Sequence, residues 1–213
     1  MVVSRAARRF VLALLVFGSV AVAPVQAEES AADLARQALI ECQAGRTATD
    51  RDLRALHFTR GEALGTRAVA ADDGSADAHF SLFCNIGEQM RIDGERITSV
   101  FGFRRMMTEL DRTLEINPEH TDALASKGTL LVRLPRLFGG DQPRGEAMLR
   151  HVLEKDPRAF STRLTLARLS EERGERENAL AFAARALEIA NEQGRADKVA
   201  EAQAVLAELS REH

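Results

Sequence analysis

Apolar residues recur at the spacing of an amphipathic helix along most of the chain, and no segment of strand length alternates apolar and polar residues. In the first such stretch, Leu34, Ala35, Ala38, Leu39 and Cys42 form one stripe, because residues three and four apart share a helix face. The sequence is also rich in alanine, leucine, glutamate and arginine, which favour helices. The pattern predicts an all-α protein with nine helices, at residues 31–44, 49–71, 75–91, 98–116, 121–134, 141–155, 161–173, 176–192 and 195–209.

Glycine and proline separate the predicted helices. Gly45 is expected to end the first helix, since glycine is the usual residue just after a helix. Pro118 and Pro157 each follow a periodic apolar run, and proline disfavours helix in the residue before it. The helices therefore group into pairs, and the last complete pair spans the 34 residues 158–191, which follow Pro157 and end at Asn191.

This last pair resembles a tetratricopeptide repeat (TPR), a 34-residue helix-turn-helix unit. Ala167, Ala179 and Ala186 match the small residues that let the two helices of a unit cross closely. The large aromatic residue usual near the start of a unit is absent, because Leu124 and Arg163 stand there. The resemblance is good over 158–191, fair over 119–157 and loose over 31–118. It implies a TPR-like helical-hairpin solenoid of about four helix pairs plus a C-terminal capping helix.

In that family the first helices of the pairs line a concave face that holds a segment of another protein. The resemblance therefore implies a groove lined by side chains of the first helices: Leu39, Phe80, Cys84, Thr129, Val132, Arg133, Leu164 and Arg168. Burial of a few apolar side chains would supply affinity, and charged flanks would set the register of the partner segment.

A second, local resemblance covers one loop. The stretch Leu134-Pro135-Arg136-Leu137-Phe138-Gly139-Gly140-Asp141 is similar to a helix-loop-helix of the TatT family, TPR-like periplasmic components of TRAP-type solute transporters. It implies an accessory component that binds a small molecule in an enclosed pocket. The chain departs from that family in lacking a lipid-acceptor cysteine, since none lies between the N-terminal apolar run and Cys42.

The N-terminus has the parts of a secretory signal peptide. Arg5, Arg8 and Arg9 precede an apolar run over residues 10–23, and the segment Val25-Gln26-Ala27 places small residues where a signal peptidase requires them. The run is well short of the roughly 20 residues of a membrane-spanning helix. We expect a signal peptide at 1–27, a helical repeat domain at 28–213, and a periplasmic or secreted protein that meets a membrane only through the signal segment. Cleavage removes these three arginines and no acid, so the net charge changes from −3 to −6.

Two features leave alternatives open. Cys42 and Cys84 fall on first helices of neighbouring pairs, where they either form a disulfide or pack as two small apolar residues. A Phe and Met cluster forms either core or an apolar ligand pocket; its members are Phe80, Phe83, Phe101, Phe103, Met106 and Met107. Within this cluster Phe103 is the residue expected to be exposed.

The sequence carries no recognisable catalytic constellation. It has no His-Glu-x-x-His, no Gly-x-Ser-x-Gly and no phosphate-binding glycine loop, and its five histidines share no metal-ligand spacing. The absence of Trp and Tyr and the negative charge disfavour sugar and nucleic-acid binding. Four arginines around the Gly139-Gly140 loop form a possible anion-attracting rim: Arg133, Arg136, Arg144 and Arg150.

We therefore expect an exported, non-enzymatic protein-binding or scaffolding module with no catalytic residue, no metal and no cofactor. The alternative is the solute-binding accessory that the TatT likeness implies.

Overall fold

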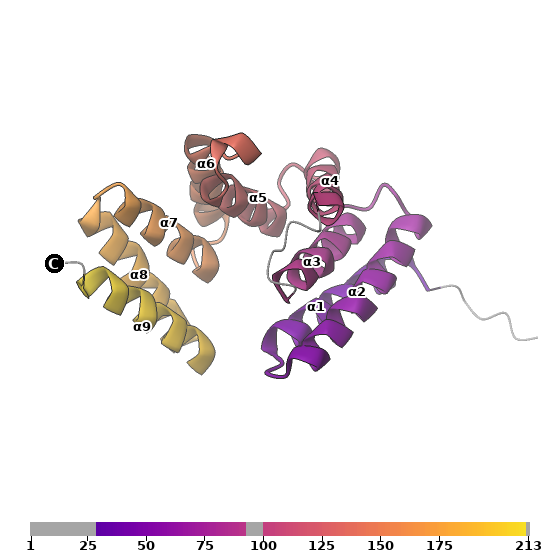
Figure 1. Cartoon of the computed structure of the whole chain (residues 1–213), viewed down its shortest axis with the longest axis horizontal. Helices are drawn as coiled ribbons and strands as arrows, with labels where there is room; N and C mark the ends of the chain where they lie inside the picture. Colours follow the sequence, from indigo (N-terminus) through magenta and orange to yellow (C-terminus); the bar gives the residue numbers. More distant parts are fainter. Residues whose placement is uncertain (1–28, 93–99, 212–213) are drawn as a thin grey trace, which may run out of the picture.

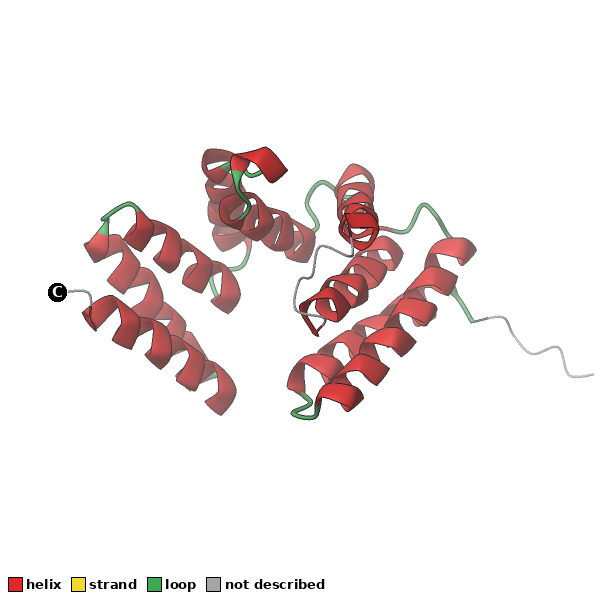
Figure 2. Ribbon diagram, in the orientation of Figure 1, coloured by secondary structure: helices red, strands yellow, loops and turns green. Residues whose placement is uncertain are grey.

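The computed structural model describes residues 29–92 and 100–211, and within these ranges it contains nine α-helices, one 3₁₀ turn and no strand (Figure 2). The predicted signal peptide at 1–27 lies outside the described residues. The helices are α1 (Ala31–Thr47), α2 (Arg51–Ala71), α3 (Ala76–Ile92), α4 (Val100–Ile116), α5 (Thr121–Arg133), η2 (Arg136–Phe138), α6 (Gln142–Lys155), α7 (Phe160–Glu172), α8 (Arg176–Glu192) and α9 (Ala196–Arg211). The all-α fold predicted from the sequence is confirmed.

The helices form consecutive pairs along an arch, with α5 and α6 near its middle (Figure 1). α1 packs on α2, α3 on α4, α5 on α6 and α7 on α8, while α9 packs on α8. α3 also packs against both α1 and α2, so the first three helices form one bundle. This is the predicted solenoid of four helix pairs and a final helix. No described helix is long and apolar enough to span a membrane.

The final helix covers the apolar face of the last pair. The small residues Ala179, Ala183 and Ala186 of α8 are fully buried in a core that also contains Ala202 and Leu209 of α9. Because alanines occupy this core, α8 lies close to its neighbours on both sides.

The first helix does not end at Gly45 but continues to Thr47. Gly45 is buried against the ring of Phe58 on α2, and a Cβ atom there would collide with that ring. The glycine therefore permits close packing of α1 on α2, and the prediction that it ends the helix is wrong.

Cys42 and Cys84 form a disulfide between α1 and α3. Their Cα atoms are 6.3 Å apart, and both side chains are buried beside Phe58. Of the two alternatives left open by the sequence, the structure contains the bridge.

The Phe and Met cluster is core. Phe80, Phe83 and Met106 are buried, and Phe103 packs against this group. Phe101 is 84% exposed, so the expectation that Phe103 is the exposed member is wrong. On α4 the apolar stripe includes Phe103, Met106, Met107, Leu110 and Leu114, and Phe101 lies on the opposite helix face.

Candidate functional site

The loop between α5 and α6 is held by its own backbone. Pro135 accepts hydrogen bonds from the backbone N–H groups of Phe138 (2.9 Å) and Gly140 (3.1 Å). Asp141 donates its backbone N–H to the Leu131 carbonyl at 2.9 Å, which ties the end of the loop to the last turn of α5. These bonds fix the loop as one compact turn.

Gly139 and Gly140 each need to be glycine, for different structural reasons. Gly139 has φ of 86°, a left-handed conformation that L side chains rarely adopt. At Gly140 a Cβ atom would collide with the carbonyl group of Leu134. Asp141 then begins α6 by accepting a hydrogen bond from the Arg144 backbone N–H at 3.1 Å.

This turn presents two large apolar side chains to solvent. Leu137 is 88% exposed and Phe138 is 64% exposed. Arg133 and Arg136 precede them and Arg144 follows, all three exposed. Among the described residues, none of these arginines has an acidic partner. We call Leu137, Phe138 and these three arginines the loop tip.

Arg150 does not belong with these arginines, contrary to the predicted rim. Its guanidinium pairs with Glu146 at 2.8 Å and lies 5.8 Å from the centre of the Phe182 ring. Burial raises the pKa of Glu146, but hydrogen bonds from Arg173 and Arg150 outweigh it and leave that pKa below its ordinary value. Glu146 thereby connects α6 to the turn after α7, and Arg150 is part of this connection.

The predicted groove residues divide into two groups. Phe80, Cys84, Val132 and Leu164 are buried in helix contacts, so they belong to the core and do not line an open groove. A first helix in this stack packs against its own partner helix and against the neighbouring units, which leaves it little free surface. The other predicted groove residues keep accessible surface: Leu39, Thr129 and Arg168 are partly exposed, and Arg133 is exposed.

The accessible groove residues of α5 and α7 lie in two stretches of the sequence that contain no acid. No Asp or Glu occurs between Asp122 and Asp141, or between Asp156 and Glu171. Val132 packs with Leu166 and Leu169, which brings the end of α5 beside α7. Arg133 and Arg168 flank this contact, and neither has an acidic partner among the described residues. The chain carries more acids than bases overall, so these two stretches differ in charge from the rest of the sequence. We call Thr129, Arg133 and Arg168 the basic first-helix face. The two acid-free runs are readable from the sequence, although motif analysis did not find them.

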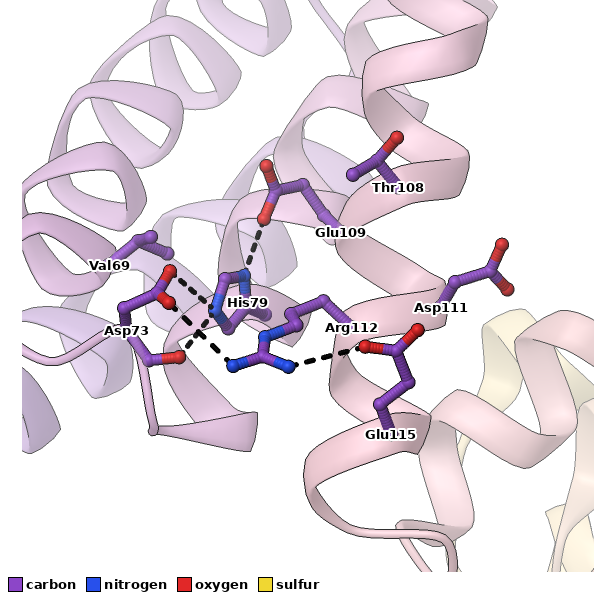
Figure 3. A pocket seen from close by; sticks show the side chains of 8 residues that line it. All are labelled: Val69, Asp73, His79, Thr108, Glu109, Asp111, Arg112 and Glu115. Carbon is purple, nitrogen blue, oxygen red and sulfur yellow. Dashed lines mark hydrogen bonds and ion pairs between the residues drawn. The ribbon is translucent and has the colours of Figure 1, made fainter.

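A polar hollow of about 410 Å³ lies where α2, α3 and α4 meet (Figure 3). His79 on its wall is buried, with Nδ1 2.6 Å from Glu109 Oε2 and Nε2 3.0 Å from the Asp73 carbonyl oxygen. Arg112 pairs with Glu115 at 3.2 Å and with Asp73 at 3.7 Å. Both ring nitrogens of His79 are within hydrogen-bond distance of oxygen atoms of the protein. The ring is therefore not placed to act as a base toward a bound substrate. This network stabilises the contact between α3 and α4.

The sequence matches no protein-family profile, and it matches no curated protein. Among solved structures, the chain is similar to TTC0263, a thermophilic TPR protein of Thermus thermophilus. The two chains are 18% identical, and the superposition has a TM-score of 0.54 over 84% of this chain and 100% of the other. The chain therefore has the fold of TPR proteins.

Proposed function

We propose that the protein is an exported, non-enzymatic module that holds a segment of a partner protein on its basic first-helix face. The TPR-like fold supports this proposal, as stacked helix pairs form extended surfaces for binding. The observation that carries it is the pair of arginines, Arg133 on α5 and Arg168 on α7, within the two acid-free stretches. A partner segment with carboxylate side chains complements this face, and the partly exposed Thr129 offers it a hydroxyl group.

Selection from a random peptide display library against residues 28–213 tests this function. We expect the enriched peptides to be rich in Asp and Glu, and to bind about tenfold more weakly to the Arg133→Gln/Arg168→Gln variant. The matched control is Arg60→Gln/Arg104→Gln, which removes two exposed arginines of α2 and α4 that also lack an acidic partner among the described residues. Failure to enrich any peptide family would contradict the proposed function. Equal loss of binding in both variants would contradict the proposed face.

Export is the second part of the proposal. It is supported by the signal-like pattern at 1–27 and by the Cys42–Cys84 disulfide, since such bonds persist in oxidising compartments. N-terminal sequencing of the protein recovered from the culture medium or from a periplasmic fraction should begin at Glu28. An intact N-terminus at Met1 would contradict it.

The solute-binding alternative has no observation in its favour. It requires an apolar pocket among the Phe and Met side chains, and all of these side chains except the exposed Phe101 pack against one another as core.

A further inference from the structure

We propose that the loop tip docks on an anionic membrane surface, inserting Leu137 and Phe138 among the lipid headgroups while the arginines bind lipid phosphates. This proposal goes beyond the proposed function, because it concerns the exposed turn between α5 and α6 and a different kind of partner. Arg133 is the one residue that the loop tip shares with the first-helix face.

Two neighbouring apolar side chains of the loop tip are held in an exposed position. Leu137 is 88% exposed and Phe138 is 64% exposed, although both are large and apolar. The backbone bonds from Phe138 and Gly140 to Pro135, and from Asp141 to Leu131, hold the turn in this shape. The side chains are therefore presented on a preformed turn, and no ordering of the loop opposes their insertion.

The shape of the tip favours a bilayer over a protein partner. The two side chains occupy adjacent positions on a single 3₁₀ turn, and each would need its own pocket on a folded partner. The interfacial region of a bilayer accepts leucine and phenylalanine without a preformed pocket.

Arginines on both sides of the tip in the sequence would attract an anionic surface. Arg133, Arg136 and Arg144 flank the two apolar side chains in the sequence and have no acidic partner among the described residues, whereas Arg150 pairs with Glu146. The nearest acid in the sequence is Asp141, whose carboxylate accepts the Arg144 backbone N–H. Each arginine near an anionic lipid surface strengthens partition by about fivefold, so three of them together with two apolar anchors give measurable binding.

The experiment uses residues 28–213, since the apolar run at 10–23 would itself bind lipid and the described core lies wholly within 29–211. Sedimentation compares vesicles of equimolar phosphatidylglycerol and phosphatidylcholine with vesicles of phosphatidylcholine alone, at low and at physiological salt. We expect at least tenfold stronger partition on the anionic vesicles, weakening as salt rises. Equal partition on both kinds of vesicle, or none on either, would overturn the proposal.

Variants of the loop tip and a matched control variant show which residues contact the lipid. Leu137→Ser/Phe138→Ser and Arg136→Gln/Arg144→Gln should each lower partition at least tenfold, and their circular dichroism and melting should match the wild type. The control Ile40→Ser/Leu53→Ser removes two exposed apolar residues of α1 and α2 and should leave partition unchanged. If the control lowers partition as much as the tip variants do, another face binds the lipid and the proposal fails.

Fluorescence gives a second readout at the tip itself. The chain contains no Trp, so Phe138→Trp supplies a single reporter, and Phe101→Trp supplies one at an exposed site on α4. Anionic vesicles should shift the emission of the first variant to the blue and leave the second unchanged. If Phe138→Trp does not shift, and a library peptide instead loses binding to Leu137→Ser/Phe138→Ser, the tip is a protein contact and the membrane proposal is overturned. The first-helix face is tested separately, by comparing peptide binding to Arg133→Gln/Arg168→Gln with binding to its control Arg60→Gln/Arg104→Gln.

Discussion

Gly128 of α5 and Gly145 of α6 face each other where the two helices cross. A Cβ atom built on Gly145 would lie 2.7 Å from the Gly128 carbonyl oxygen, and one built on Gly128 would lie 3.0 Å from the Gly145 carbonyl oxygen. Neither contact can be relieved by turning a side chain, because both involve backbone atoms. The central pair of the arch therefore depends on two glycines that lie 17 positions apart in the sequence.

Gly145→Ala should destabilise the protein by about 1–3 kcal/mol, since α5 and α6 must move apart to admit the methyl group. Gly87→Ala is the control: its nearest neighbour is the flexible Met106 side chain, with Sδ 3.2 Å from the added Cβ. Alanine favours helix over glycine, so this control should be neutral or stabilising. Thermal melting followed by circular dichroism measures both variants, and an unchanged melting temperature for Gly145→Ala would contradict the crossing.

Ala179→Leu should destabilise by about 1–3 kcal/mol, because Ala179 is fully buried among α7, α8 and α9 and extra methylene groups have no space there. Ala181→Leu on the exposed face of the same helix should have almost no effect. Urea denaturation separates the two cases, and a neutral Ala179→Leu would show that the packing of the last repeat is different.

Under denaturant the oxidised protein should contain no free thiol, since Cys42 and Cys84 are bridged. Detection of two thiols in protein isolated without reductant would contradict the bridge. Reduction should lower stability by about 2–4 kcal/mol, because the bridge joins residues 42 positions apart and restricts the unfolded chain. Melting with and without reductant measures this loss, and the Cys42→Ser/Cys84→Ser variant shows whether reductant acts elsewhere.

Glu146→Gln should lower stability at neutral pH and have less effect in acid. The pKa of Glu146 is below its ordinary value in the folded protein, so its ion pairs stabilise the fold above the glutamate range of about 4. That contribution is lost as the pH falls through the folded-state pKa. Melting temperatures of wild type and variant should therefore differ at pH 7 and converge once the pH has fallen below the folded-state pKa of Glu146. A difference that stays constant with pH would indicate lost packing instead of lost ion pairs.

The arrangement of the helices follows from local signals in the sequence. Pro118 and Pro157 lie between helices as predicted, and α8 has the predicted bounds because a glycine lies just beyond each of its ends. Gly45 was misread because a glycine chosen for close packing inside a helix has the same local pattern as one that ends a helix. Only the position of Phe58, on the next helix, distinguishes the two.

The candidate site was less predictable, since accessibility depends on how the pairs stack. Val132 and Leu164 are on first helices as the resemblance implies, yet contacts from neighbouring units bury them. The pairing of Arg150 with Glu146 was visible as acid and base four positions apart on one helix. The exposure of Leu137 and Phe138 can be recognised only in the folded structure. In the sequence, an apolar dipeptide beside glycine is equally compatible with a buried turn and with an exposed one.

The bridge between α1 and α3 also constrains the order of events during biogenesis. A chain that carries it contains a closed covalent ring of some forty residues, from Cys42 to Cys84, that cannot be pulled out into a single extended strand. If the polypeptide crosses a membrane through a channel wide enough for one strand, the two sulfur atoms must still be apart during passage. Oxidation then follows transit and locks the first three helices together on the far side, which makes the return of the folded chain through the same channel impossible.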